Sequence, residues 1–132
     1  MSAGRYSFTI EQGATLDFEL AYKDSNNDPI DLTGYQGRMQ IRPSVGSDTV
    51  YITLSSSLEP DGTGLNFSGS DGLNPPTSGT IGIFISANSS SLLNFNEAVY
   101  DLELATGSEY PVVTRLLEGQ VKLSKNVTLG SF

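Results

Sequence analysis

The 132-residue chain contains no cysteine, no histidine and no tryptophan. The absence of cysteine excludes disulfide bridges, zinc ribbons and thiol nucleophiles. The absence of histidine excludes a Ser-His-Asp triad, an imidazole base and ordinary transition-metal sites. We therefore expect a non-enzymatic protein with no catalytic residues, no bound metal and no other cofactor.

Basic residues are scarce, with 7 Lys and Arg against 15 Asp and Glu, a formal net charge of −8 and a pI near 4.2. Nucleic-acid binding needs a basic stripe, and anionic membranes attract basic segments, so we expect neither partner. No apolar run approaches the roughly 18–20 residues that span a bilayer. The first five residues lead into strand-like sequence without a visible signal peptide, so we expect synthesis in the cytoplasm.

The length predicts a single domain, spanning residues 1–132, with a sizeable core. Apolar and polar residues alternate with period two along most of the chain, which is typical of half-buried strands. Acidic residues fall on the polar side of this alternation at Asp17, Glu19, Asp101 and Glu103. We expect strands at 5–11, 15–22, 35–43, 49–54, 65–67, 79–86, 97–106 and 112–127.

Turn-forming residues separate these expected strands. Residues 24–31 are short and polar with one proline, and Gly107-Ser108 has the composition of a hairpin turn. The Ser- and Gly-rich stretch 55–78 is either a loop that becomes ordered on a partner or an ordinary connection. Gly119 interrupts the last strand and predicts a bulge or bend there.

One short helix is expected near residues 86–95. Ser86 or Asn88 is a suitable N-cap, and Leu92, Leu93 and Phe95 form its apolar edge. The whole pattern predicts an all-β fold, an antiparallel Ig-like β-sandwich of about seven to nine strands with one short helix.

Asp24, Asn26 and Asp28 have the spacing of the first three ligands of a calcium loop. Pro29 stands where such a loop needs glycine, and Tyr35 stands where it needs a bidentate glutamate. The segment therefore predicts a turn and not a calcium site.

Asp101 and Glu103 lie two residues apart on one strand face, whereas glycosidases need carboxylates opposed across a cleft. We expect both on a solvated outer face. Arg115 is in phase with Val113 and Leu117, which predicts a guanidinium on a mostly buried face. Its partner would be Asp101 or an acidic group of another subunit. The alternative is a side chain that extends to solvent.

Several segments resemble small virion proteins of tailed bacteriophages, in particular the N-terminal β-sandwich of phage upper-baseplate proteins. The segments are Tyr6–Gly13, Leu16–Leu20, the Pro-Ile-Asp-Leu-Thr-Gly turn within Asp28–Tyr35, Arg38–Arg42, Gly79–Ile83, Tyr100–Leu104, Thr114–Val121 and Asn126–Thr128. This resemblance implies a structural subunit of the tail or baseplate, located in the virion. The baseplate proteins continue into a receptor-side region, so we expect here a separate small subunit that packs onto larger virion proteins.

The contacts of such a subunit would involve sheet edges, the N-terminal arm and the loops. Large side chains with expected exposure are the candidates, in multiple copies of a symmetric assembly. They are Arg5, Tyr6, Arg38, Arg42, Tyr51, Leu73, Tyr110 and Phe132. A capsid decoration protein is the first alternative, and a carbohydrate-binding β-sandwich using Tyr51 or Tyr110 is the second.

Overall fold

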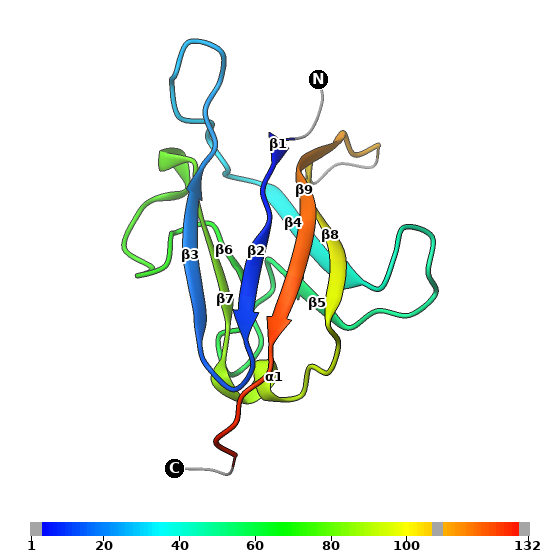
Figure 1. The fold of residues 1–132 in the computed structure, drawn as a ribbon. Coiled ribbons are helices and arrows are strands. Elements are labelled where there is room, and N and C mark those ends of the chain that lie inside the picture. The colour runs from blue at the N-terminus through cyan, green and yellow to red at the C-terminus, as the bar shows by residue number, and fades with distance from the viewer. Residues whose placement is uncertain (1–3, 107–109, 130–132) are drawn as a thin grey trace.

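The computed structural model describes residues 4–106 and 110–129, and within these ranges the chain is mostly β-structure (Figure 1). In chain order the strands are β1 (Gly4–Arg5), β2 (Phe8–Glu11), β3 (Leu16–Ala21), β4 (Tyr35–Arg42), β5 (Ile52–Ser55), β6 (Gly64–Asn66), β7 (Thr80–Ile85), β8 (Glu97–Thr106) and β9 (Val113–Ser124). The helical segments are the 3-10 helix η1 (Pro76–Ser78) and the α-helix α1 (Ala87–Ser91). The prediction of an all-β chain with one short α-helix is confirmed.

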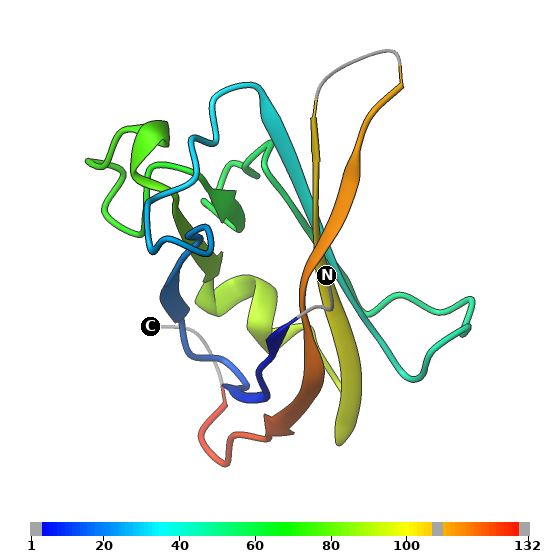
Figure 2. The same cartoon turned by 90° about the horizontal axis from the view of Figure 1, so that it is seen from above.

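The strands form two sheets that face each other (Figure 2). The larger sheet has the order β1-β9-β8-β4-β5, and β2 also pairs with β9. The smaller sheet has the order β3-β7-β6. Buried side chains of both sheets form one cluster, including Met39 and Ile41 of β4 and Ile81 and Ile83 of β7. The predicted alternation is the cause, because every second residue of these strands points toward the cluster.

The larger sheet is mixed, so the prediction of a wholly antiparallel fold was wrong. The strand expected at 5–11 is divided into β1 and β2, and both run parallel to β9. Between them, the hydroxyl oxygen of Ser7 accepts a hydrogen bond from the amide of Gln120 at 3.2 Å. Alternation in the sequence indicates which face of a strand is buried but says nothing of the direction of its neighbour.

A bulge in β9 lies at a different residue from the predicted one. Leu102 is paired with Leu117, but Glu103 is paired with Arg115, so Leu116 is the extra residue. Gly119 is regularly paired with Tyr100 and serves another purpose. A Cβ at Gly119 would collide with the backbone of Tyr6, so the glycine permits close approach of the N-terminal segment.

Helix α1 begins at the predicted cap. The hydroxyl of Ser86 accepts a hydrogen bond from the amide of Ser89 at 3.1 Å. Leu93 and Phe95 are buried as expected, whereas Leu92 is 84% exposed. The prediction for Leu92 was wrong because the helix ends at Ser91, and Leu92 follows it as an outward-facing C-cap.

The connections are held by local hydrogen bonds. As predicted, residues 24–31 form a turn, in which the Asp24 carboxylate accepts from the amides of Asn26 and Asp28. The stretch 55–78 contains β6 and η1, and the amide of Ser70 donates to Glu19 on β3 at 2.9 Å. Strand β9 ends at Ser124, so the expectation that it extends to residue 127 was wrong. The predicted turn at 107–108 lies outside the described residues.

Candidate functional site

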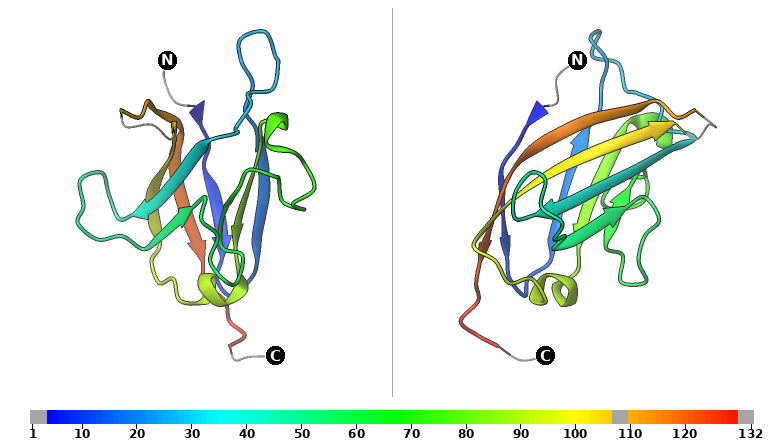
Figure 3. Two further views of the ribbon diagram at one scale, coloured as in Figure 1. Left: turned by 180° about the vertical axis from the view of Figure 1, so that it is seen from behind. Right: turned by 90° about the vertical axis from the view of Figure 1, so that its right-hand side faces the viewer.

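A broad depression with a volume of about 810 Å³ lies on the outer side of the larger sheet. This side of the sheet faces the viewer in the right-hand view of Figure 3. Strands β4, β8 and β9 form its floor, β1 adds one residue, and the connection between β4 and β5 forms part of its rim. All four arginines of the chain line it, together with three carboxylates. We call this surface the arginine face and define it by Arg5, Arg38, Arg42, Arg115, Asp101, Glu103 and Glu118.

Strand register brings these side chains together. In β4, Arg38 and Arg42 alternate with buried residues and therefore point outward. Antiparallel pairing places Arg38, Glu103 and Arg115 in one row across β4, β8 and β9. Cross-strand neighbours of this kind lie about 4.5–5.5 Å apart at Cβ, close enough for their charges to interact.

The bulge at Leu116 decides where Arg115 points. Without an extra residue, Arg115 would share the inward side of β9 with Leu117, two residues away. With the bulge, Arg115 is opposite Glu103 and faces outward, and its side chain is 53% exposed. Of the two interpretations of Arg115, the buried face was therefore wrong and the side chain that extends to solvent is confirmed. Asp101, one of the two partners considered, is confirmed as its partner.

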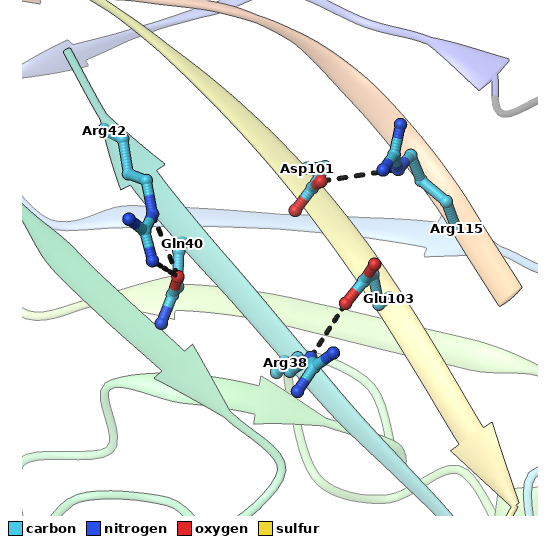
Figure 4. A network of polar contacts seen from close by, with 6 residues as sticks. All are labelled: Arg38, Gln40, Arg42, Asp101, Glu103 and Arg115. Atoms are coloured by element: carbon cyan, nitrogen blue, oxygen red, sulfur yellow. Dashed lines mark hydrogen bonds and ion pairs between the residues drawn. The ribbon is translucent and has the colours of Figure 1, made fainter. Parts of the chain in front are cut away.

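Three ion pairs join the charges of the arginine face, and two of them are drawn in Figure 4. Arg38 Nε lies 2.8 Å from Glu103 Oε1, and Arg115 Nε lies 3.4 Å from Asp101 Oδ2. Arg115 Nη1 is also 3.8 Å from Glu118 Oε2. Exposed pairs of this kind contribute about 0–1 kcal/mol each, so they orient side chains more than they stabilise the fold.

Two guanidiniums of the arginine face are not neutralised in this way. Within residues 4–106 and 110–129, Arg5 and Arg42 form no ion pair with a carboxylate. Arg42 instead donates to the side-chain oxygen of Gln40, at 3.1 Å from Nε and 2.6 Å from Nη2 (Figure 4). It also donates to the carbonyl oxygen of Ser47. These neutral acceptors fix the Arg42 guanidinium while leaving its charge available to a carboxylate from another molecule.

Asp101 lies next to the row of Arg38, Glu103 and Arg115, opposite Gln40 and Glu118 and two residues before Glu103 on β8. Partial burial and the neighbouring negative charge of Glu103 raise the pKa of its carboxyl, and Arg115 and Arg38 oppose the shift only in part. As expected, Asp101 and Glu103 share the outer side of β8. Each forms an ion pair with an arginine, Glu103 with Arg38 and Asp101 with Arg115.

The structure gathers three of the predicted contact residues on the arginine face, namely Arg5, Arg38 and Arg42. Leu73 and Tyr110 are 82% and 84% exposed but do not line it. The remaining predicted residues are Tyr6, Tyr51 and Phe132.

Tyr6 is 48% exposed and packs against the rings of Phe8 and Phe18. The expectation that Tyr51 is freely exposed was wrong, because its ring is half-buried and stacks on Phe95 at 4.6 Å between centroids. Phe132 lies outside the described residues.

Sequence reasoning did not include Glu118 or Val45 among the contact residues. Val45 is 93% exposed on the rim of the arginine face. Its position in the polar turn after Arg42 was a usable signal, since a valine between serine and glycine has no strand to pack in. Glu118 gave no such signal, because its place beside Arg115 depends on the bulge.

No protein-family model matches the chain, and neither does any curated protein sequence. In the part of the chain that the structure describes, no helix is long and apolar enough to cross a membrane. Among the same residues, no three acidic side chains are close enough together to hold a metal ion.

Proposed function

We propose that the chain is a non-enzymatic structural protein of a tailed-bacteriophage virion, made in the bacterial cytoplasm and located in the tail or baseplate. It acts through protein–protein contacts with other virion proteins, in several copies of a symmetric assembly. The resemblance of segments such as 28–35 and 114–121 to phage baseplate proteins supports the class. The gathering of all four arginines on one open surface is the observation that carries the contact role.

The fold in this proposal is an Ig-like β-sandwich, with the two sheets as its layers. Nine described strands and one cluster of buried side chains drawn from both sheets support it. Sandwiches of this kind typically contain seven to nine short strands in about 100 residues. Such a scaffold presents two sheet faces and their edges, which suit a subunit that must contact several neighbours.

The chemistry of the arginine face favours a protein partner. A guanidinium binds carboxylates through two parallel hydrogen bonds, and arginine is enriched in protein interfaces. The surface is open and broad, unlike the enclosed pockets that bury most of a small ligand. The exposed side chain of Val45 adds an apolar contact at its rim.

The test is to purify particles of the phage whose genome encodes this chain and to locate the chain in them. Mass spectrometry should find it in fixed proportion to the major tail proteins, and a reconstruction of the particle should place it in the tail or baseplate. Absence from purified particles would overturn the proposal. Density on the head lattice would establish the capsid-decoration alternative instead.

A binding assay distinguishes the proposed structural role from the carbohydrate-binding alternative. A glycan array with purified protein should show no specific binding under this proposal. Micromolar binding that is lost in Tyr110→Ala and retained in Leu73→Ala would favour a glycan-binding module. Both substituted side chains are more than four-fifths exposed, so neither change should disturb folding.

A further inference from the structure

Positive and negative charge are separated between the two sheets. The arginine face holds four of the seven basic residues of the chain, and residues 43–114 contain none. Strands β6 and β7 of the smaller sheet lie in that range, and β3 also contains no lysine or arginine. Four arginines against three carboxylates leave the arginine face slightly positive, in a chain whose net charge is −8.

The smaller sheet carries acidic side chains on its outer side. Asp17 and Glu19 are exposed on β3 and alternate with half-buried apolar residues that face the core. The loop at Gly69 and Ser70 covers Gly82 on the same side, and Asp71 follows it. We call this surface the acidic face and define it by Asp17, Glu19 and Asp71.

The two faces point in opposite directions, because the sheets lie on either side of the core (Figure 2). The arginine face of one molecule can therefore meet the acidic face of another while both of their remaining faces stay open. A contact between two different faces repeats from copy to copy, and it produces a ring if the rotation closes or a filament if it does not.

We propose that the arginine face binds the acidic face of a second copy of this chain. Arg5 and Arg42, which form no carboxylate pair within the described residues, would take Asp17 and Glu19 of the neighbour as their partners. Glu19 accepts a hydrogen bond from the amide of Ser70 at one oxygen, and its other oxygen has no hydrogen bond within residues 4–106 and 110–129. This inference names a partner for the proposed structural role and in that respect rests on it.

Charge complementarity within one sequence favours a second copy over an unrelated partner. Outside the arginine face each molecule carries about nine negative charges in excess, so every copy brings an acidic surface to the next. Fifteen residues line the arginine face, fewer than the roughly 20–30 per side of a standard stable interface. A single contact should therefore be weak, and closure of a ring of copies would strengthen it.

Two charge-reversal variants test the contact. Arg5→Glu/Arg42→Glu reverses two charges of the arginine face and leaves the acidic face unchanged. Asp17→Lys/Glu19→Lys reverses two charges of the acidic face and leaves the arginine face unchanged. Sedimentation velocity at up to about 1 mM protein measures association, a range that includes weak complexes. Lys122→Glu/Lys125→Glu is the matched control, because it changes the net charge as Arg5→Glu/Arg42→Glu does, at residues that belong to neither the arginine face nor the acidic face. Circular dichroism confirms that each variant is folded.

The wild-type chain and the lysine control should associate with increasing concentration in 0.15 M salt and dissociate in 1 M salt. The screening length falls from about 8 Å to about 3 Å over that change. Each face variant alone should be monomeric. An equimolar mixture of the two should associate again. The intact arginine face of one variant meets the intact acidic face of the other, and the two reversed faces, glutamate against lysine, also attract each other.

A wild-type chain that stays monomeric at 1 mM in 0.15 M salt would overturn the inference. So would face variants that associate alone, or a wild-type dimer that does not grow further. Virions that incorporate Arg5→Glu/Arg42→Glu normally would overturn the self-contact and leave the proposed function standing. A chain that assembles through these faces but is absent from virions would overturn the function and leave the self-contact.

Discussion

The hydroxyl of Tyr100 donates a 2.6 Å hydrogen bond to the carbonyl oxygen of Tyr6, which lies 94 residues earlier in the chain. Tyr100 belongs to β8 and is 5% exposed, and Tyr6 joins β1 to β2. Strand β9 lies between them, and Gly119 on β9 is the residue paired with Tyr100. The hydrogen bond therefore passes over Gly119, which has no side chain to block it, and it holds the N-terminal segment against the larger sheet.

Removing this hydroxyl should weaken the fold. Tyr100→Phe leaves the Tyr6 carbonyl without its donor, and we expect the free energy of unfolding at pH 7 to fall by about 1 kcal/mol. Urea denaturation measures the change. Tyr110→Phe is the control, since Tyr110 is 84% exposed and its variant should match the wild type. Equal stability of the Tyr100 variant and the wild type would mean that the bond contributes nothing.

The same variant should change stability in alkali. Burial, with a smaller contribution from Tyr6, raises the pKa of Tyr100 to about 12 from its usual 10.0. The folded state keeps this proton after the unfolded state has lost its own. The stability that results is full below pH 10 and is lost as the pH rises through 12. Tyr100→Phe should lose about 2 kcal/mol less than the wild type over that interval, and parallel pH profiles would contradict this.

Gly119 should tolerate no side chain. A Cβ at this position collides with the Tyr6 backbone and comes within 3.2 Å of the Tyr100 ring. We expect Gly119→Ala to lower the free energy of unfolding by about 2–3 kcal/mol through overpacking. It should also speed hydrogen exchange of the Tyr6 amide, which donates to the Glu118 carbonyl at 3.0 Å. The neighbouring variant Gln120→Ala is the control, and equal exchange rates in both would contradict the prediction.

Asp61, in the connection between β5 and β6, forms hydrogen bonds with the start of α1. Its carboxylate accepts from the hydroxyls of Ser86 at 2.6 Å and Ser89 at 2.8 Å and from the Thr63 amide at 3.0 Å. These bonds, the one from Ser86 most of all, hold its pKa well below the usual 3.8. The stability they contribute is present above pH 3.8 and is lost as the pH falls below that value.

Asp61→Asn should therefore lower the melting temperature at neutral pH and make it less sensitive to acid. The amide nitrogen of asparagine cannot accept from a serine hydroxyl, so at least one of these bonds is lost. Thermal melts of both proteins at pH 7 and pH 3 test this, with Asp71→Asn as a control on an exposed loop. Equal acid sensitivity in wild type and Asp61→Asn would exclude the carboxylate as its source.

The alternation of apolar and polar residues predicted the buried sides of β4, β7 and β8, because the apolar residues at every second position mark the side that faces the core. Met39, Ile83 and Leu102 are fully buried on the sides that the pattern indicated. The parallel pairing of β1 and β2 with β9 was not predictable in this way. It depends on which distant strand lies alongside, and the two segments are more than a hundred residues apart.

The arginine face shows the same division. Arg38 and Arg42 share an outward side of one strand, which the sequence alone indicates. Their meeting with Arg5 and Arg115 requires the register of three strand pairs, β4 with β8, β8 with β9 and β9 with β1, and one inserted residue. An insertion of this kind reverses the direction of every side chain beyond it, so a local pattern assigned Arg115 to the wrong side.

The last prediction concerns the ion pair between Asp101 and Arg115, which we expect not to stabilise the fold. The raised pKa of Asp101 means that its ionised form is less favourable in the folded chain than in the unfolded one. Its contribution to stability is full below pH 3.8 and is lost as the pH rises through the folded pKa. Asp101→Asn should therefore equal or exceed the wild type at pH 7, by up to about 0.5 kcal/mol after solvent screening.

Arg115→Gln should act in the opposite direction. It removes the guanidinium that lies 3.4 Å from Asp101 and 3.8 Å from Glu118, and leaves those carboxylates near Glu103. We expect a loss of about 0.5–1 kcal/mol at pH 7, because like charges on neighbouring strands repel. The loss should be smaller near pH 3, where the Asp101 carboxyl, whose pKa is raised, is protonated. Urea denaturation of both variants at the two pH values measures this. A loss at pH 7 in Asp101→Asn as large as that in Arg115→Gln would show that the Asp101–Arg115 pair itself stabilises the sheet.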